Sequence, residues 1–357
     1  MIEHNDTGTG RGYDQSRAGG SGEAALPVFV IGGPTASGKS ALAVDLAEAT
    51  DGIVINADSM QLYADLNVLT ARPSIAELDR VPHRLYGVLD GNERSSVAHW
   101  RDAAEREIRA ALACGRVPVV VGGTGLYLKS LMQGLSPVPP SDPSKRARAE
   151  ALHHELGAEG FHADLAARDP EMAARLPAGD TQRCVRAWEV ITATGRSLAD
   201  WQRLPPSGAP SGMMFRPITL MPDRAVVYRA CEERFLRMVD SGAVEEVRRL
   251  RARNLANDLP VMKAVGVPEL SAFIEGRIPL HEAVERASTA TRRYAKRQMT
   301  WFRHQMGGGK WVAPPNLSDD PPEDPHFDPA GGMKVPVCTQ YSKRLAPEIL
   351  SLIRFSR

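Results

Sequence analysis

The chain has 357 residues, a formal net charge of +1 and 43% hydrophobic residues, enough for two modest domains with a true core. No apolar run reaches the ~18 residues of a membrane span, and the N-terminus lacks the layout of a signal peptide. The four scattered cysteines form no Cys-x-x-Cys pair, which argues against a zinc knuckle and indicates a reducing compartment. We therefore predict a cytoplasmic protein.

Both ends of the chain have the composition of loose tails. Residues 1–25 are rich in Gly, Ser, Asp and Arg and contain little to bury, which predicts a disordered tail. Residues 314–357 begin with a Pro- and Asp-rich stretch and are predicted to form a second tail with a short terminal helix. The ordered part is expected to lie between them.

Strand patterns alternate with helix patterns in most of the ordered part. Short runs rich in β-branched residues predict buried strands at LPVFVIGG (26–33), GIVINADS (52–59), RLYGVLD (84–90), RVPVVVGGT (116–124) and RPITLMP (216–222). Helices are predicted over Ser40–Thr50, Val97–Cys114, Gly125–Gln133, Val226–Ser241, Ala243–Arg253 and Leu280–His304. This alternation predicts an α/β fold, in which helices cover both faces of a parallel sheet.

The pattern changes at a proline-rich joint, Ser136–Arg146, after which no convincing strand appears before RPITLMP. Two helices are expected here, over residues 147–168 and 180–195, the second capped by Asp180 and ended by Gly195. A second flexible joint, LPPSGAPSG, follows at residues 204–212. We therefore predict a catalytic core of residues 26–138 and 213–313, interrupted by a mostly helical insertion over residues 139–212.

The most specific motif is a P-loop, which lies between a predicted strand and a predicted helix. It consists of Gly33, Pro34, Thr35, Ala36, Ser37, Gly38, Lys39 and Ser40. In such loops, backbone N–H groups and the helix N-terminus bind phosphate, the lysine adds a positive charge, and the serine can ligate Mg²⁺. The sequence therefore predicts a P-loop NTPase-like core that binds a diphosphate or polyphosphate. Most such loops bind ATP or GTP, but the loop does not identify its ligand.

Two polar residues at the ends of other predicted strands are candidates for the same site. Asp58 ends GIVINADS, and the carboxyl ends of parallel strands meet at one sheet edge. A carboxylate there can hold Mg²⁺ indirectly or accept a proton from a nucleophile, although Asp is also a common helix N-cap. Thr124 follows Gly122 and Gly123, which either permit close backbone approach or form an ordinary tight turn.

The charge of the chain is unevenly distributed. Residues 286–304 (RASTATRRYAKRQMTWFRH) contain six Lys or Arg residues and no Asp or Glu, so a near-neutral total hides a basic segment. Cations in this segment are candidates for contact with nucleic acid phosphates, namely Arg292, Arg293, Lys296 and Arg297. Its aromatic residues Tyr294, Trp301 and Phe302 are expected in the core.

The ordered set of motifs resembles the tRNA dimethylallyltransferase family over roughly Pro27–Trp311. The stretches that carry the resemblance are GPTASGKS, NADSMQLY, LTARP, PHRLY, VPVVVGGTGLYLKSL, DTQRCVRAWEV, EERFLRMVDSGAVEEVRRL and TRRYAKRQMTWFR. That family transfers a dimethylallyl group from dimethylallyl diphosphate to N6 of the adenosine on the 3′ side of the anticodon, giving N6-(dimethylallyl)adenosine and diphosphate. The resemblance implies that the loop holds the diphosphate of this prenyl donor, without ATP hydrolysis.

The resemblance also implies roles for single residues. Asp58 would be the general base, Arg234 would contact the diphosphate, Thr124 would lie near the reacting centre, and Ser40 would ligate Mg²⁺, the implied cofactor. The implied tRNA contacts are Asp58, Ser59, Met60, Gln61, Thr124, Arg146, Gln182, Arg183, Cys184, Val185 and Arg186. An ordinary amphipathic helix with Cys184, Val185 and Trp188 inward is compatible with this reading. The implied partners are the anticodon stem-loop of tRNA and the prenyl donor, with no membrane, and the working form is expected to be a monomer.

Three positions depart from the family pattern, and three other functions remain open. Leu69 stands where the family usually has Gly, Arg72 where it has Lys, and Val267 where Tyr is common. The alternatives are a small-molecule kinase, a prenyl transferase acting on free adenine nucleotides, and a non-catalytic RNA-binding module. A kinase does not explain the helical insertion or the acid-free basic segment. A nucleotide-directed transferase needs no RNA-binding surface, and a binding module does not explain Lys39, Ser40 and Asp58 together.

Overall fold

The computed structural model describes residues 26–306 and 310–312, so both predicted tails lie outside the described residues. Within this part of the chain, a six-stranded parallel sheet has the order β3-β2-β4-β1-β5-β6. Its strands are β1 (Pro27–Gly32), β2 (Ile53–Asn56), β3 (His83–Arg84), β4 (Pro118–Gly122), β5 (Met214–Leu220) and β6 (Lys310–Val312). The predicted α/β class with a parallel sheet is confirmed.

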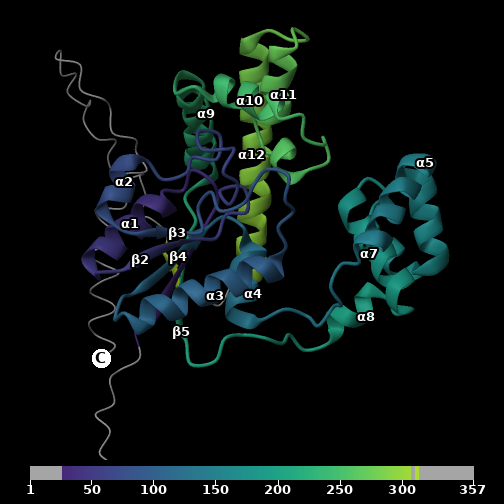
Figure 1. Cartoon of the computed structure of the whole chain (residues 1–357), viewed down its shortest axis with the longest axis horizontal. Helices are drawn as coiled ribbons and strands as arrows, with labels where there is room; N and C mark the ends of the chain where they lie inside the picture. The colour runs from purple at the N-terminus through teal and green to yellow at the C-terminus, as the bar shows by residue number, and fades with distance from the viewer. Residues whose placement is uncertain (1–25, 307–309, 313–357) are drawn as a thin grey trace, which may run out of the picture.

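Helices cover both faces of the sheet (Figure 1). One face packs against α1 (Lys39–Ala49), with α2 (Ile75–Arg80) beside it, and the other against α3 (Val97–Ala113) and α4 (Gly125–Gln133). In the central strand β1, Phe29 and Ile31 belong to the first layer, while Val28 and Val30 belong to the second. Because successive side chains point to opposite faces, a strand buried on both sides is apolar throughout, which explains the uninterrupted run in the sequence.

A further helical layer lies beside the sheet and contains the helices that follow β5 (Figure 1). It consists of α9 (Arg224–Asp240), α10 (Ala243–Ala252), the short 3₁₀ helix η1 (Pro260–Lys263), α11 (Val267–Ile274) and α12 (Leu280–Gln305). The long helix α12 joins this layer to the sheet (Figure 1). Near its start, Ala283 and Ala287 pack in the core of the helical layer, and near its end, Phe302 is buried in the core between the sheet, α3 and α4.

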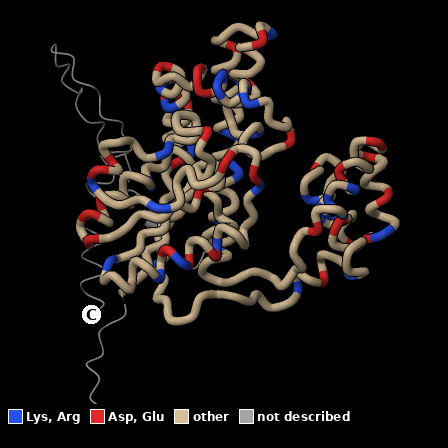
Figure 2. Tube along the Cα trace, in the orientation of Figure 1, with Lys and Arg blue, Asp and Glu red and all other residues tan. Residues whose placement is uncertain are grey.

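The segment between the two proline-rich joints folds into a body with its own core (Figure 1). Its helices are α5 (Pro143–Arg168), α6 (Pro170–Arg175), α7 (Thr181–Thr194) and α8 (Leu198–Arg203). Phe161 and Trp188 lie in its apolar cluster, which is separate from those of the core. The two connections to the insertion are joined by backbone hydrogen bonds between Leu135 and Ser207. Residues 134–141 and residues 204–213 include no charged side chain, as the tan linkers of Figure 2 show.

Three sequence predictions were wrong in detail. RLYGVLD does not form a strand over residues 84–90, because Leu85 and Gly87 have φ values of 63° and 61°, and only His83–Arg84 pairs with β2. The helix expected over 147–168 is broken at Gly157, where φ is 68° and ψ is 179°. Asp180 occupies the N-cap position of α7 but its side chain makes no capping hydrogen bond, whereas Gly195 ends the helix in the left-handed conformation as predicted.

Candidate active site

The P-loop connects β1 to α1, and a hydrogen bond between two of its own residues holds it in a compact shape. Gly38 has a φ of 84°, a left-handed conformation that glycine adopts without strain, directly before the first turn of α1. Gly33 has no room for a side chain, because a Cβ there would lie 2.7 Å from the Leu220 carbonyl oxygen. Lys39 Nζ donates to the Pro34 carbonyl oxygen over 3.1 Å. The N-terminus of α1 therefore opens onto a compact loop, which is the geometry of an anion site.

The P-loop offers serine hydroxyl oxygens, and no carboxylate cluster, as ligands for a magnesium ion among the described residues. Ser40 is exposed in the first turn of α1, and Ser37 Oγ is buried without a hydrogen-bond partner in residues 26–306 and 310–312. No group of three or more His, Cys, Asp or Glu suited to a metal occurs among the same residues. Because Mg²⁺ prefers one or two protein oxygens with water and phosphate completing its shell, a serine hydroxyl beside a phosphate site suits it.

Asp58 is held in a tight turn at the carboxyl end of β2. The fully buried Asn56 side chain accepts from Asp58 N–H (2.8 Å) and donates to the Asp58 carbonyl oxygen (3.0 Å). Asp58 Oδ1 accepts from Met60 N–H (3.0 Å), while Oδ2 makes no hydrogen bond within the described part of the chain. One carboxylate oxygen therefore fixes the turn, and the other is available to a ligand.

Thr124 links the turn after β4 to the turn that carries Asp58. Its N–H donates to the Ala57 carbonyl oxygen (3.2 Å), and its Oγ1 accepts from Ser59 N–H (3.0 Å) and donates to Ser59 Oγ (3.3 Å). Thr124 does not line the main cleft described below, whereas Ser59 does. Its observed contacts fix the position of Ser59 beside Asp58.

Arg234 approaches the P-loop from α9. Its Nη1 donates to Thr35 Oγ1 (3.0 Å) and its Nη2 to the Thr70 carbonyl oxygen (3.5 Å). Sequence spacing alone gave Arg234 no special status, and the structure brings it to the phosphate-binding loop 199 residues away. A guanidinium in this place adds positive charge where a diphosphate would bind.

The segment that Arg234 contacts is anchored by a buried carboxylate. Glu246 on α10 is 3% exposed and accepts from the N–H groups of Asn67, Val68 and Leu69 at 2.7–2.9 Å. Gln61 Nε2 in turn donates to the carbonyl oxygens of Thr70 and Ala71 (2.9 and 2.8 Å). Gln61 therefore faces this segment, and it lines a small secondary hollow with Ser40 instead of the main cleft.

Two of the three departures from the family pattern lie in one apolar cluster. Leu69 and Val267 both belong to the core formed by α9 to α12. A Cβ on Gly266, directly before Val267, would lie 2.8 Å from Leu69 Cδ2. The larger side chain at position 69 thus fills space beside this glycine, and its main effect is on local packing.

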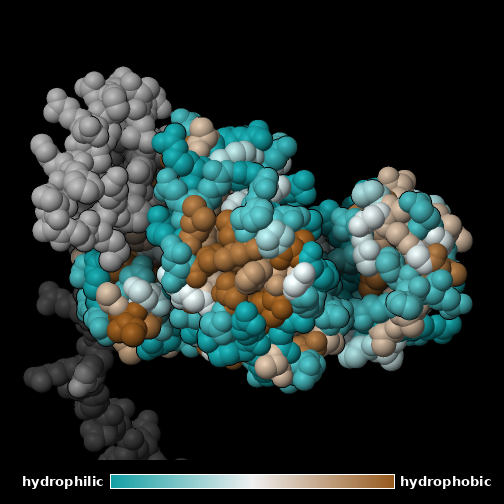
Figure 3. Space-filling view, turned by 90° about the horizontal axis from the view of Figure 1, so that it is seen from above, coloured by the Kyte–Doolittle hydropathy of each residue, from teal (hydrophilic) through white to brown (hydrophobic). Residues whose placement is uncertain are grey.

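A cleft of about 860 Å³ opens between the core and the insertion. Eight of the predicted site residues line it: Thr35, Asp58, Ser59, Met60, Arg146, Gln182, Val185 and Arg234. In the view from above (Figure 3), the insertion forms a lobe beside the core, with apolar residues gathered on the core surface. The structure thus places the P-loop, the Asp58 turn and the insertion around one space large enough for a prenyl diphosphate and a base.

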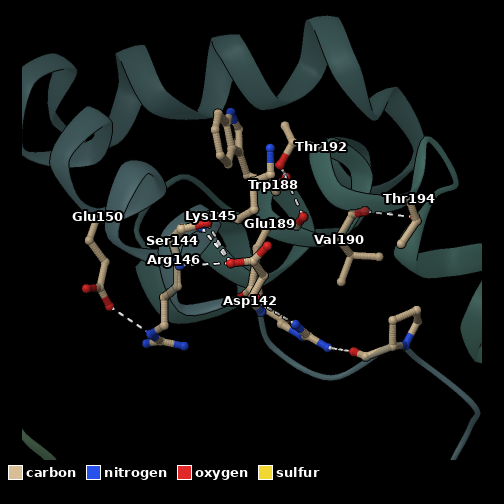
Figure 4. Close-up of polar contacts among 12 residues, drawn as sticks. Asp142, Ser144, Lys145, Arg146, Glu150, Trp188, Glu189, Val190, Thr192 and Thr194 are labelled. Carbon is tan, nitrogen blue, oxygen red and sulfur yellow. Dashed lines mark hydrogen bonds and ion pairs between the residues drawn. The ribbon is translucent and has the colours of Figure 1, made fainter.

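The helix α7 presents its predicted RNA-contact residues in different ways. Gln182 and Val185 line the cleft. The Arg183 side chain is 75% exposed, and its Nε lies 3.6 Å from Asp180 Oδ2. Cys184 is 1% exposed and its Sγ donates to the Pro177 carbonyl oxygen, so this residue packs inside the insertion. Arg146 lines the cleft from α5 and pairs with Glu150 at 3.0 Å (Figure 4).

Arg186 is engaged in an internal clamp at the entry to the insertion. Its Nη1 donates to Glu189 Oε1 (2.7 Å) and its Nη2 to the Pro139 carbonyl oxygen (2.6 Å). Glu189 is 1% exposed and also accepts from Asp142 N–H at 2.9 Å, near which it lies in Figure 4. These bonds fasten the first joint to α7, so the observed role of Arg186 is structural.

Sequence reasoning placed Tyr294 in the core, and the structure corrects this. Tyr294 is partly buried and lines the cleft, with the Arg297 guanidinium 5.7 Å from its ring centre. Burial raises the pKa of Tyr294, and the nearby Asp58 carboxylate raises it further. Phe302 is buried as predicted. Arg292 pairs with Glu232, whereas Arg293, Lys296 and Arg297 are exposed.

Comparison with known proteins identifies the family. The IPP transferase family model matches residues 61–305. A tRNA dimethylallyltransferase of Rhodospirillum centenum is 57% identical over 291 residues, which covers 82% of this chain and 93% of that protein. The chain belongs to the IPP transferase family. A tRNA dimethylallyltransferase of a Methylobacterium species is 54% identical, over 80% of this chain and 94% of its own length.

Solved structures of IPP transferases share the fold. A tRNA isopentenylpyrophosphate transferase of Bacillus halodurans is 32% identical, with a TM-score of 0.56 over 81% of this chain and 90% of its own. A eukaryotic dimethylallyltransferase acting on tRNA is 24% identical, with a TM-score of 0.67 over 81% and 74%. The family resemblance and the P-loop NTPase-like fold predicted from the motifs are both confirmed. Among residues 26–306 and 310–312, no helix has the length and apolar character needed to cross a membrane.

Proposed function

We propose that this chain transfers a dimethylallyl group from dimethylallyl diphosphate to N6 of the adenosine 3′-adjacent to the anticodon of tRNA, releasing diphosphate. The observation that carries the proposal is the shared cleft, which is lined by Thr35 of the P-loop, by Asp58 and by the helical insertion. Relatives that are more than half identical are tRNA dimethylallyltransferases. A kinase would need the loop but has no use for the Asp58 turn and the insertion in this arrangement.

The donor half of the site stabilises the leaving group. When the allylic C–O bond breaks, negative charge builds on the diphosphate, and the loop N–H groups, Lys39 and Arg234 would oppose it. Ser40 would hold the magnesium ion, which when bound supplies further positive charge to the diphosphate. The remaining loop residues Gly33, Pro34, Thr35, Ala36, Ser37 and Gly38 shape the cradle.

The acceptor half of the site supplies the base. The adenine N6 lone pair forms a bond to C1 of the dimethylallyl unit as the C–O bond breaks, and the N6 proton passes to Asp58 Oδ2. The amine is a weak nucleophile because its lone pair is delocalised into the ring, so removal of this proton assists attack. Thr124 holds Ser59 in place, and Ser59 and Met60, which line the cleft, would surround the target base. Gln61 would support this side of the site indirectly, through its bonds to the Thr70 and Ala71 carbonyl oxygens.

The insertion would bind the anticodon stem-loop beside this site. A stacked adenine cannot reach Asp58, so the base must turn out of the loop into the cleft. Arg146, Gln182, Arg183 and Val185 are the residues of the insertion that face the cleft or solvent, and we propose them as tRNA contacts. Cys184 and Arg186 would contribute by supporting the helix from within.

We further propose that the protein acts as a cytoplasmic monomer.

The direct test is incubation with dimethylallyl diphosphate, Mg²⁺ and unmodified tRNA, followed by mass analysis of the nucleosides. Formation of N6-(dimethylallyl)adenosine is expected, with no product when ATP replaces the prenyl donor. A parallel reaction with free AMP distinguishes a transferase that acts on nucleotides. Phosphorylated product from ATP, or equal prenylation of AMP and tRNA, would contradict the proposal.

A further inference from the structure

Gln298 on α12 joins two parts of the active site that come from distant regions of the chain. Its side chain is buried, its Oε1 accepts from Thr35 N–H (2.8 Å), and its Nε2 donates to the Gly123 carbonyl oxygen (2.9 Å). One partner is a donor and the other an acceptor, and the amide satisfies both because it has one acceptor oxygen and a donor nitrogen. The hydrogen-bonding groups of the Gln298 amide therefore complement both of its partners.

The two partners of Gln298 belong to opposite halves of the proposed reaction. Thr35 lies in the P-loop, and its hydroxyl accepts from Arg234. Gly123 directly precedes Thr124, which bonds to Ser59 in the turn that carries Asp58. A single side chain thus connects the loop proposed to hold the diphosphate with the turn proposed to hold the base.

The Gln298 side chain is packed so closely between Thr35 and Gly123 that it fixes the distance between these two residues. A Cβ on Gly123 would lie 2.3 Å from Gln298 Nε2 and 3.5 Å from Asp58 Oδ2. No side chain larger than hydrogen fits at Gly123 while Gln298 keeps its position. The separation between the P-loop and the turn after β4 is therefore spanned by the length of this one amide side chain.

We propose that Gln298 is a positioning residue that sets the distance between the bound diphosphate and Asp58. The inference rests on the proposed function, because this spacing matters only if the loop holds the prenyl donor and Asp58 serves the acceptor. Misplacement of reacting groups by about 1 Å costs on the order of 10²-fold in rate. Loss of the bridge should therefore lower kcat while leaving the KM values for donor and tRNA nearly unchanged.

The variant Gln298→Glu tests the bridge through its pH dependence. The ionised carboxylate still accepts from Thr35 N–H, but it has no proton to donate to the Gly123 carbonyl oxygen. Once protonated, the introduced carboxyl has the shape and the donor of the original amide. Burial and the nearby Asp58 carboxylate raise the pKa of such a carboxyl, whereas the Thr35 N–H and the Arg234 guanidinium bonded to Thr35 lower it. Burial is expected to be the larger effect, so the bridge should re-form as the pH falls toward neutrality.

The measurement is kcat for prenyl transfer to tRNA, expressed as the ratio of variant to parent at each pH from about 6 to about 9. The ratio should be on the order of 10⁻² at the alkaline end and rise toward one as the pH falls. The matched control is Gln305→Glu on the same helix, where the exposed side chain contacts Lys129 Nζ (2.7 Å). Its ratio should stay close to one at every pH.

A ratio for Gln298→Glu that is near one throughout, or is lowered equally at every pH, would overturn the inference. If circular dichroism shows that this variant does not fold, Gly123→Ala decides, because its Cβ displaces Gln298 from the other end of the bridge. It must then lower kcat by a similar factor without weakening donor affinity. Failure of the parent protein to prenylate tRNA would refute the proposed function itself, which separates the two outcomes.

Discussion

Replacing Asp58 by asparagine should remove the base while leaving the turn intact. Asp58 Oδ1 accepts from Met60 N–H at 3.0 Å, and a carboxamide oxygen can accept the same bond. Asn56 bonds to the backbone of Asp58, so these bonds do not depend on the side chain at position 58. The change from a charged to a neutral acceptor should cost about 1 kcal/mol of folding free energy at most.

The rate of transfer should fall far more than the stability. A positioned general base contributes 10²–10⁴-fold, equivalent to about 3–5 kcal/mol in the activation barrier. In Asp58→Asn, the adenine N6 proton loses its acceptor. The P-loop is unchanged, so the dissociation constant of the donor should remain within about twofold of the parent value.

The assay is single-turnover transfer to unmodified tRNA, quantified by nucleoside mass analysis, with donor affinity measured by calorimetry. The matched control is Asp51→Asn, a change at an exposed carboxylate that pairs with Arg116 after α1. This control should transfer at the parent rate. If Asp58→Asn also transferred within about threefold of the parent, Asp58 would not be the base and the acceptor half of the mechanism would be refuted.

Four further predictions concern the donor, the metal and the RNA. Lys39→Ala should weaken donor binding and slow transfer, and equal donor affinity in variant and parent would contradict the P-loop assignment. Chelation of Mg²⁺ should abolish transfer and its return restore it, whereas full activity in EDTA would exclude a metal at Ser40. Arg183→Ala should raise the KM for tRNA and reduce the salt slope by about one. Arg186→Ala should leave that slope unchanged and cost about 2 kcal/mol of stability, because the buried Glu189 loses its charged partner. A lowered slope would make Arg186 an RNA contact.

The sequence was sufficient for the features that are local. The P-loop lies between a strand and a helix as its glycines and Lys39 require, and the strand β1 reads as buried because both its faces are covered. Asp58 was expected at the same sheet edge as the loop because the carboxyl ends of parallel strands meet there, and in the structure β2 and β1 are both neighbours of β4. These features depend on short-range patterns and on the geometry of parallel strands.

The sequence was insufficient where distant contacts decide a role. Arg183 and Arg186 are one helical turn apart and look alike in the sequence, but only Arg186 meets the buried Glu189 and the Pro139 carbonyl oxygen. Gln298 attracted no attention because its partners lie 263 and 175 residues away. No local periodicity marks such a residue, and only the packing of α12 against the sheet reveals it.

The proposed function requires that the P-loop hold a prenyl diphosphate and not a nucleoside triphosphate. Calorimetric titration of the full chain with dimethylallyl diphosphate and, separately, with ATP, both with Mg²⁺, tests it most directly. We expect saturable binding of the prenyl donor that is weakened in Lys39→Ala, and much weaker binding of ATP. Tight binding of ATP together with no binding of the prenyl donor would contradict it.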